Sequence, residues 1–296
     1  MYKYINNYPS DRENGWSDEL QGVTHDDDHW FFTQKGTLWK FPVEHDLKIR
    51  ITHADPANGI LKRAIPSQLA ELRYNHFGDL CHFNGYLFIP ITGPDRTPII
   101  AAFKADDLSY IACKIMDGYV SVAWCAFNPN DELLYTSNKH LGAAEQDAVS
   151  PIKRYKIDMD KLVSLGRLVL TEQSPLVLTD EQGGDIQLKY MQGGAFDHQD
   201  HLHILNGYAE NLDAKDGGIS VFDTTTSKRI ARSRNGKGDF NYQYKPQFPR
   251  YEEPEGLTYW DLDDHRAPKI SGQLHAIMLD NDLKTDDFYF KHYKLK

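Results

Sequence analysis

Five polar side chains that can do acid–base or metal chemistry stand within two positions of the same point in a pattern that recurs along this chain. They are Gln21, His76, Asp79, Gln192 and Glu255. Two carboxylates and an imidazole can serve general acid–base catalysis, in which His76 and Asp79 are the catalytic candidates. Carboxylate and amide oxygens are also the ligands that calcium takes in proteins. Whether the five side chains meet depends on the elements that carry them.

The recurring pattern is a small residue, a polar turn and then an apolar strand at a fixed offset. In four copies the strand begins with a large residue eight positions after the small one. The pairs are Gly22 and Trp30, Gly78 and Tyr86, Cys125 and Leu133, and Gly194 and Leu202. A fifth copy begins at Gly256 and has a longer turn. Internal repeats of this kind indicate a repeat architecture.

The first four copies each continue with a third strand that ends in an aromatic residue, followed by a polar turn and a fourth strand. The aromatic residues are Phe41, Phe103, Tyr155 and Phe222. Four strands in each of five repeats predict an all-β, five-bladed β-propeller. We therefore expect one domain over residues 1–296. Its blades should start near residues 20, 76, 123, 192 and 254.

The fifth copy ends before its fourth strand, in the sequence DDFYFKHYKLK. A propeller has to close, because an open edge strand is free to pair with other chains. The N-terminal segment around Tyr2 to Ile5 is apolar enough to supply the missing strand. We predict that it pairs with the last blade and closes the ring.

In a propeller the first strand of each blade lines the central axis, so the five polar side chains should converge there. Two roles are open for them. They can form a ligand or ion site, in which Gln21 and Gln192 would bind the ligand, or they can hydrogen-bond the backbones of neighbouring blades and hold the ring together.

Glu255 is the strongest candidate for a metal ligand. It precedes Gly256, and a glycine lets the backbone come close to an ion on the axis. With Asp79 and Asn138 it would supply oxygen ligands of the type that calcium prefers. The sequence thus predicts Ca²⁺ as cofactor, held by Glu255, Asp79 and Asn138.

The segment EPEGLT around Glu255 resembles the calcium-bearing propeller enzymes of the SMP-30/gluconolactonase and paraoxonase type. That resemblance implies an axial calcium, held by the glutamate of an E-G motif, which polarises a lactone or ester carbonyl. Only Glu255 and Gly256 match the motif directly, with Asn138 as a possible partner ligand. Those enzymes have six blades and carry the motif in the first. Other phrases, such as MQGGAF and GGISVFD, look like an uncharacterised bacterial propeller family.

The leading functional hypothesis is a calcium-assisted hydrolase or lactonase-like enzyme that acts on a small neutral or sugar-derived substrate. The alternative is a carbohydrate- or protein-binding propeller without catalysis. In that case an aromatic surface including Trp124, Tyr244 and Trp260 would stack on the ligand. A third hypothesis makes the axial residues purely structural.

Composition limits the partners. The net charge of −10 argues against nucleic acid and anionic membrane surfaces, which bind clustered Lys and Arg. A small-molecule or glycan ligand fits better, and the sequence identifies no protein partner. The first residues lack the apolar stretch of a signal peptide, and no apolar run is long enough to span a membrane. We expect a cytoplasmic protein, with a secreted origin left open.

Two histidine-rich segments fall in the hairpin turns of the repeat. They are HDDDH at residues 25–29 and DHQDHLH at residues 197–203. On a helix, histidines four residues apart would suggest a zinc site, but in this position a polar turn is the better interpretation.

Overall fold

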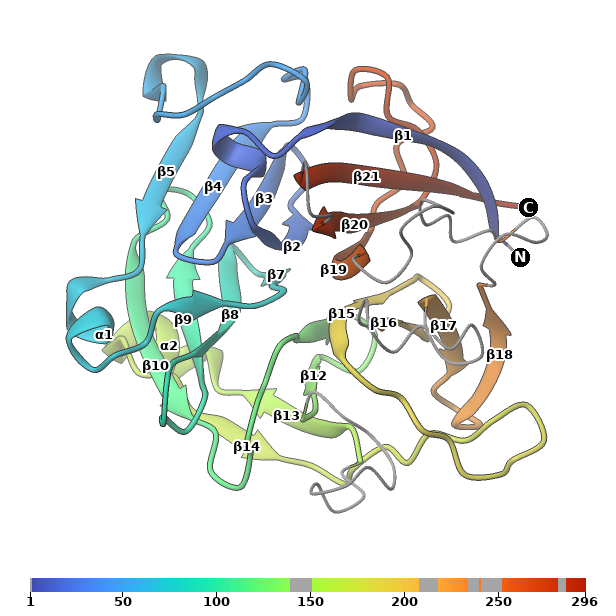
Figure 1. Ribbon diagram of the computed structural model, residues 1–296. Coiled ribbons are helices and arrows are strands. Elements are labelled where there is room, and N and C mark those ends of the chain that lie inside the picture. The colour runs from blue at the N-terminus through green and yellow to red at the C-terminus, as the bar shows by residue number, and fades with distance from the viewer. Residues whose placement is uncertain (1, 139–150, 208–217, 234–239, 241–251, 282–285) are drawn as a thin grey trace.

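The computed structural model describes residues 2–138, 151–207, 218–233, 240, 252–281 and 286–296. Five small antiparallel sheets stand around a common centre as the blades of a propeller (Figure 1). The two ends of the chain lie beside each other in the last blade. The predicted all-β, five-bladed fold is confirmed.

The first three blades follow one another along the chain. Blade 1 comprises β2 (Leu20–His25), β3 (His29–Gln34), β4 (Thr37–Pro42) and β5 (Leu61–Ala64). Blade 2 comprises β6 (His76–Phe77), β7 (Cys81–Phe83), β8 (Tyr86–Thr92), β9 (Ile99–Lys104) and β10 (Tyr110–Ile115). Blade 3 comprises β11 (Ala126–Asn128), β12 (Leu133–Thr136), β13 (Lys153–Ile157) and β14 (Leu170–Glu172).

The last two blades complete the ring. Blade 4 comprises β15 (Met191–Phe196), β16 (His201–Asn206), β17 (Gly218–Asp223) and β18 (Lys228–Arg232). Blade 5 comprises β19 (Glu252–Tyr259), β20 (Leu274–Asn281), β21 (Asp286–Leu295) and β1 (Tyr2–Arg12). The described helices are short: α1 (Ser67–Glu71), α2 (Met159–Leu165), and the 3₁₀ turns Gly15–Ser17 and Pro56–Asn58. None of these helices has the length and apolar character needed to cross a membrane.

Apolar side chains pack between neighbouring blades and bury both faces of many inner and middle strands, whereas outer strands such as β5 and β10 are partly exposed. In β3, Trp30 and Phe32 face blade 5, whereas Phe31 faces blade 2. Trp30 meets Trp260 and Phe290 of blade 5 edge to face. Middle strands such as β3 (HWFFTQ) and β8 (YLFIPIT) are therefore largely apolar along their whole length. The inner strands also carry polar residues, such as Gln21 in β2 and Gln192 in β15.

The ring closes through the N-terminal strand, as predicted. The strand β1 pairs antiparallel with β21, from Tyr2 opposite Leu295 to Arg12 opposite Asp287. It is longer than the segment around Tyr2 to Ile5 that the sequence suggested. The last blade thus takes one strand from the start of the chain and three from its end.

A hydrogen bond fastens the beginning of β1 to blade 4. The Tyr2 hydroxyl lies 2.9 Å from Nε2 of His203, and Nδ1 of His203 lies 3.2 Å from the carbonyl oxygen of His201. A neutral imidazole satisfies both contacts, since Nδ1–H donates to the carbonyl and Nε2 accepts from the hydroxyl. Burial lowers the pKa of His203 to about 4, although the nearby Asp197 carboxylate opposes this shift.

This contact predicts acid sensitivity. Because His203 has a lower pKa in the folded state than the roughly 6.5 of an unfolded chain, its contribution is complete above pH ~6.5 and is lost as the pH falls toward 4. At pH 5 the loss is about 2 kcal/mol. In His203→Gln this titration is absent. The difference in unfolding free energy between wild type and variant should therefore shrink by about that amount from pH 7.5 to pH 5, measured by urea unfolding.

The exposed Gln68 supplies the control. Its change to alanine removes no titratable group, so the difference in unfolding free energy between wild type and Gln68→Ala should stay constant over the same pH range. Parallel stability curves for wild type and His203→Gln would contradict the assignment of a neutral, buried imidazole.

Candidate functional site

The small residues that begin the five copies of the repeat lie at a narrow waist, where inner strands of neighbouring blades touch. They are Gly22, Gly78, Cys125, Gly194 and Gly256. A Cβ atom on Gly22 would lie 2.5 Å from Cα of Asp79, and one on Gly256 would lie 2.7 Å from Cα of Gly22. No side chain fits at such distances from a neighbouring backbone. This close approach explains why copies of the pattern begin with glycine.

Asp79 lies at the centre of this waist and is fully buried. Its Oδ1 accepts a hydrogen bond from the backbone N–H of Val23 at 3.0 Å, in blade 1. Its Oδ2 accepts from the N–H groups of Gly194 at 3.0 Å, in blade 4, and Leu257 at 3.3 Å, in blade 5. One carboxylate of blade 2 therefore joins three other blades.

The backbone of Asp79 reaches the remaining blade. Its N–H donates to the carbonyl of Ala123 at 2.8 Å, and its carbonyl accepts from the N–H of Cys125 at 3.3 Å. Burial raises the pKa of Asp79 well above its usual value, and the backbone N–H donors counteract this effect. Of the two roles that the sequence left open, these contacts support the structural one for Asp79.

The inner strands run in one direction past this waist, so the axis has an amino end and a carboxyl end. The remaining polar candidates lie at the amino end, where β2, β6, β15 and β19 begin. We call Gln21, His76, Gln192, Glu253 and Glu255 the amino-end cluster.

Two glutamates of this cluster share one amide. The Nε2 atom of Gln192 donates to Oε1 of Glu253 at 3.0 Å and to Oε1 of Glu255 at 3.2 Å. Gln192 and Glu255 are buried, whereas Glu253 is half-buried. The pairing of β19 with β20 is irregular between Pro254 and Leu257, the stretch that carries Glu255. Two carboxyl groups held on one nitrogen are an arrangement suited to acid–base or nucleophilic chemistry.

The other pair of the cluster is a histidine held by an amide. Nε2 of His76 donates to Oε1 of Gln21 at 2.5 Å, across blades 2 and 1. Because the acceptor is an amide oxygen, the contact places a proton on Nε2. The structure thus brings His76 together with Gln21, and Gln192 together with Glu255, as two pairs at one end of the axis.

The other predicted residues lie elsewhere. Asn138 uses its Oδ1 to accept hydrogen bonds from the N–H groups of Val120 at 2.9 Å and Ser121 at 3.3 Å. Trp124 is fully buried, and a Cβ on Gly194 would lie 2.3 Å from its ring, so the indole has no face open to a ligand. Tyr244 lies outside the described residues.

Trp260 follows the end of β19 and so lies at the carboxyl end of the axis, away from Glu255. It is buried and stacks flat on His25, with ring centroids 4.3 Å apart. Trp124 and Trp260 therefore do not form one aromatic surface with the amino-end cluster. The two rings fill space between blades, which is the ordinary use of large aromatic residues in a propeller core.

The residues predicted to hold calcium have other hydrogen-bond partners in the structure. Both carboxylate oxygens of Asp79 and the side-chain oxygen of Asn138 already accept hydrogen bonds from backbone N–H groups. Glu255 contacts an amide nitrogen, which is a donor and cannot be a ligand. Among the described residues, no group of three or more His, Cys, Asp or Glu side chains is placed to hold a metal ion.

Glu253 is the member of the cluster that sequence reasoning missed. It stands two positions before Glu255 on the same strand, and the segment EEPEG carried the signal. Side chains two positions apart on a strand lie on the same face. A search for a second acid on the face of Glu255 would have found it.

Comparisons with known proteins agree with the fold. No family model matches the chain, and no curated protein matches its sequence. It is similar to the structure of a putative exo-beta-1,3-galactanase from Bifidobacterium bifidum s17, with 13% identity and a TM-score of 0.52, over 99% of this chain and 96% of that one. It is also similar to the GH43_1 enzyme from Xanthomonas citri complexed with xylose, with 9% identity and a TM-score of 0.51, over 92% and 86% of the two chains. At these identities the likeness establishes a shared propeller fold.

Proposed function

We propose that the protein is a hydrolase that acts on a glycosidic bond, with Glu253 and Glu255 as its paired carboxyl groups. The observation that carries the proposal is the shared contact of both glutamates with Gln192. Because both contacts start from one nitrogen atom, the two oxygens are at most about 6 Å apart. Paired carboxyl groups of glycoside hydrolases lie roughly 5 to 9.5 Å apart.

The chemistry needs one carboxyl group in each protonation state. One carboxylic acid protonates the departing glycosidic oxygen, the other carboxylate attacks the anomeric carbon, and water then releases the sugar. Gln192 holds the two side chains in place, so that the pair is positioned before substrate arrives. His76, oriented by Gln21, would supply a second proton-handling group at the same end of the axis.

The names of two structurally similar proteins also support a glycosidic substrate. One carries the name of a galactanase, and the other is an enzyme complexed with xylose. Both names concern carbohydrates, which is why we favour a glycosidic bond over a lactone or ester. The net charge of −10 is compatible with a neutral sugar as substrate.

Aryl glycosides provide the test. We expect turnover of an aryl β-xyloside or aryl β-galactoside, and we expect Glu255→Gln and Glu253→Gln each to lower kcat/KM by about 10²-fold or more. Glu71→Gln is the matched control, since Glu71 is an exposed glutamate on α1. Its kcat/KM should equal that of the wild type. Thermal melts of all three variants separate loss of activity from loss of fold.

Other results would point to other functions. Full activity in both glutamine variants of the pair would exclude it from the chemistry. Saturable binding of xylose or galactose without any turnover would favour the carbohydrate-binding alternative. Activity that disappears with EDTA and returns with calcium would restore the metal-assisted hydrolase, which the present donor set does not favour.

A further inference from the structure

A cavity opens at the carboxyl end of the axis, on the other side of the waist from the amino-end cluster. Its volume is about 310 Å³, and the ends of the inner strands of all five blades line it. Thr24 comes from blade 1, Cys81 from blade 2, Phe127 from blade 3, Phe196 from blade 4 and Tyr259 from blade 5. This volume is at the lower end of the range typical of small-ligand pockets, roughly 300 to 1,000 Å³.

Aromatic rings form much of its wall. Phe83 and Phe127 stack on each other across blades 2 and 3, with centroids 3.7 Å apart. Tyr259 meets the ring of His198 edge to face, at 5.4 Å. Since each blade contributes the end of its own inner strand, the rings surround the space from several sides. Such a wall suits an apolar body or a cation, which is attracted to the face of an aromatic ring.

The formal charge of the lining is negative. Asp26 and Asp27 line the cavity, and no lysine or arginine is present among the described lining residues. Burial opposes ionisation of Asp26, but hydrogen bonds from His29 and from the N–H of Asp28 lower its pKa to about 2. Asp26 is therefore a carboxylate at any physiological pH.

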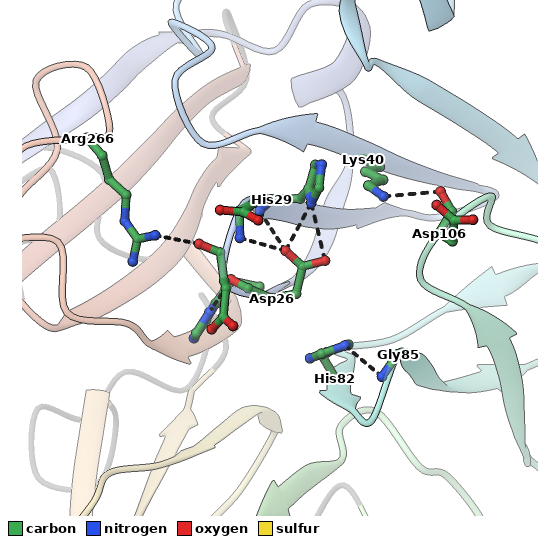
Figure 2. A network of polar contacts seen from close by, with 10 residues as sticks. Asp26, His29, Lys40, His82, Gly85, Asp106 and Arg266 are labelled. Atoms are coloured by element: carbon green, nitrogen blue, oxygen red, sulfur yellow. Dashed lines mark hydrogen bonds and ion pairs between the residues drawn. The ribbon is translucent and has the colours of Figure 1, made fainter.

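Arg266 and Lys40, the two cations labelled in Figure 2, both donate to backbone carbonyls. Arg266 donates to the backbone carbonyl of Asp27, and its guanidinium pairs with the Asp264 carboxylate at 3.0 Å. Lys40 donates to the backbone carbonyl of Asp106 at 3.1 Å. Within the described residues, no hydrogen bond or ion pair involves the carboxylate of Asp27.

Two histidines of the lining, His25 and His82, add no opposing charge at neutral pH. Burial lowers the pKa of His25 to about 4 and also lowers that of His82. Nε2 of His82 accepts from the N–H of Gly85 at 3.2 Å, so that the proton sits on Nδ1. The lining thus combines carboxylates, neutral imidazoles and aromatic faces.

We propose that this carboxyl-end cavity binds a small organic cation, with its ammonium group beside the Asp27 carboxylate and its apolar part against the rings of Tyr259, Phe83 and Phe127. A carboxylate and aromatic faces are together the elements that recognise substituted ammonium groups. An anion would meet Asp26 and Asp27 without a compensating lysine or arginine in the described lining.

Choline and its uncharged analogue 3,3-dimethyl-1-butanol test the proposal, because they have nearly the same shape and differ in charge. By isothermal titration calorimetry we expect choline to bind with a Kd of about 1 mM or tighter, and the alcohol to bind at least tenfold more weakly. Asp27→Asn should weaken choline binding by at least tenfold. Asp28→Asn is the matched control: Asp28 is an exposed neighbour in the same turn that does not line the cavity, and choline binding should be unchanged.

Equal binding of choline and the alcohol, or equal binding of choline by Asp27→Asn and wild type, would overturn the proposal. So would the absence of choline binding, or binding of xylose that choline does not displace. Glu255→Gln should retain choline binding, because Glu255 lies beyond the waist. Failure of the glycosidase assay would therefore leave this test intact.

Discussion

Asp79→Ala is expected to leave the protein without a stable fold. The variant removes the acceptor of three buried N–H groups, those of Val23, Gly194 and Leu257. Each unsatisfied group costs about 1 to 3 kcal/mol, so the total reaches at least about 3 kcal/mol. A domain has roughly 5 to 15 kcal/mol of stability, and this loss falls on a side chain that joins four blades.

Asp79→Asn should be milder but still destabilising, by about 2 kcal/mol, because the amide keeps one acceptor oxygen and turns an N–H toward another N–H. Circular dichroism and thermal melts of the purified variants measure both effects. Asp117→Ala is the control, since Asp117 is exposed. If Asp79→Ala melted within about a degree of the wild type, the carboxylate would not be holding the ring, and a role in binding would return.

Removal of residues 1–8 is the second change with a large expected effect. It deletes most of β1, from Tyr2 opposite Leu295 to Asn7 opposite Lys291, and leaves that length of β21 as an open edge. Loss of the buried Tyr2 alone costs about 2 kcal/mol, and the lost hydrogen bonds and the exposed Tyr293 add to it. We expect a drop of several degrees in Tm and a tendency to associate at the open edge.

The truncated protein also offers a rescue experiment. A synthetic peptide of residues 1–12, added in excess, should raise the Tm of the truncated protein, because a ligand that binds only the folded state stabilises it. Lys3→Ala in the full chain is the control, since Lys3 is exposed on the same strand. An unchanged melting curve after truncation would mean that blade 5 is stable without β1.

The repeat made the fold predictable, because close packing at the waist forces the same small residue into corresponding places. Gly22 and Gly256 touch each other across blades 1 and 5, and this contact requires a glycine at the same position of both repeats. The missing strand of the last blade could be inferred for a similar reason, since an incomplete repeat has to be completed from elsewhere in the chain.

The roles of the side chains could not be inferred with the same precision. Its position in the repeat predicts that Asp79 lies beside the axis. That position does not predict whether the carboxylate oxygens of Asp79 face a ligand or the N–H groups of other blades. Trp260 is close to Glu255 in sequence, but an inner strand separates the two and carries Trp260 past the waist. A repeat specifies where each residue lies in its blade. The contacts that its side chain makes depend on residues that are distant in sequence.

The waist also has a consequence for transport. Glycine backbones in contact and a carboxylate bonded to three blades leave no passage for a solute along the axis. A molecule that enters the cavity at the carboxyl end must therefore leave by the same end, and it cannot reach the amino-end cluster along the axis. A substitution in the lining of that cavity can change what binds there without altering the amino-end cluster, whereas a substitution at the waist disturbs both ends together.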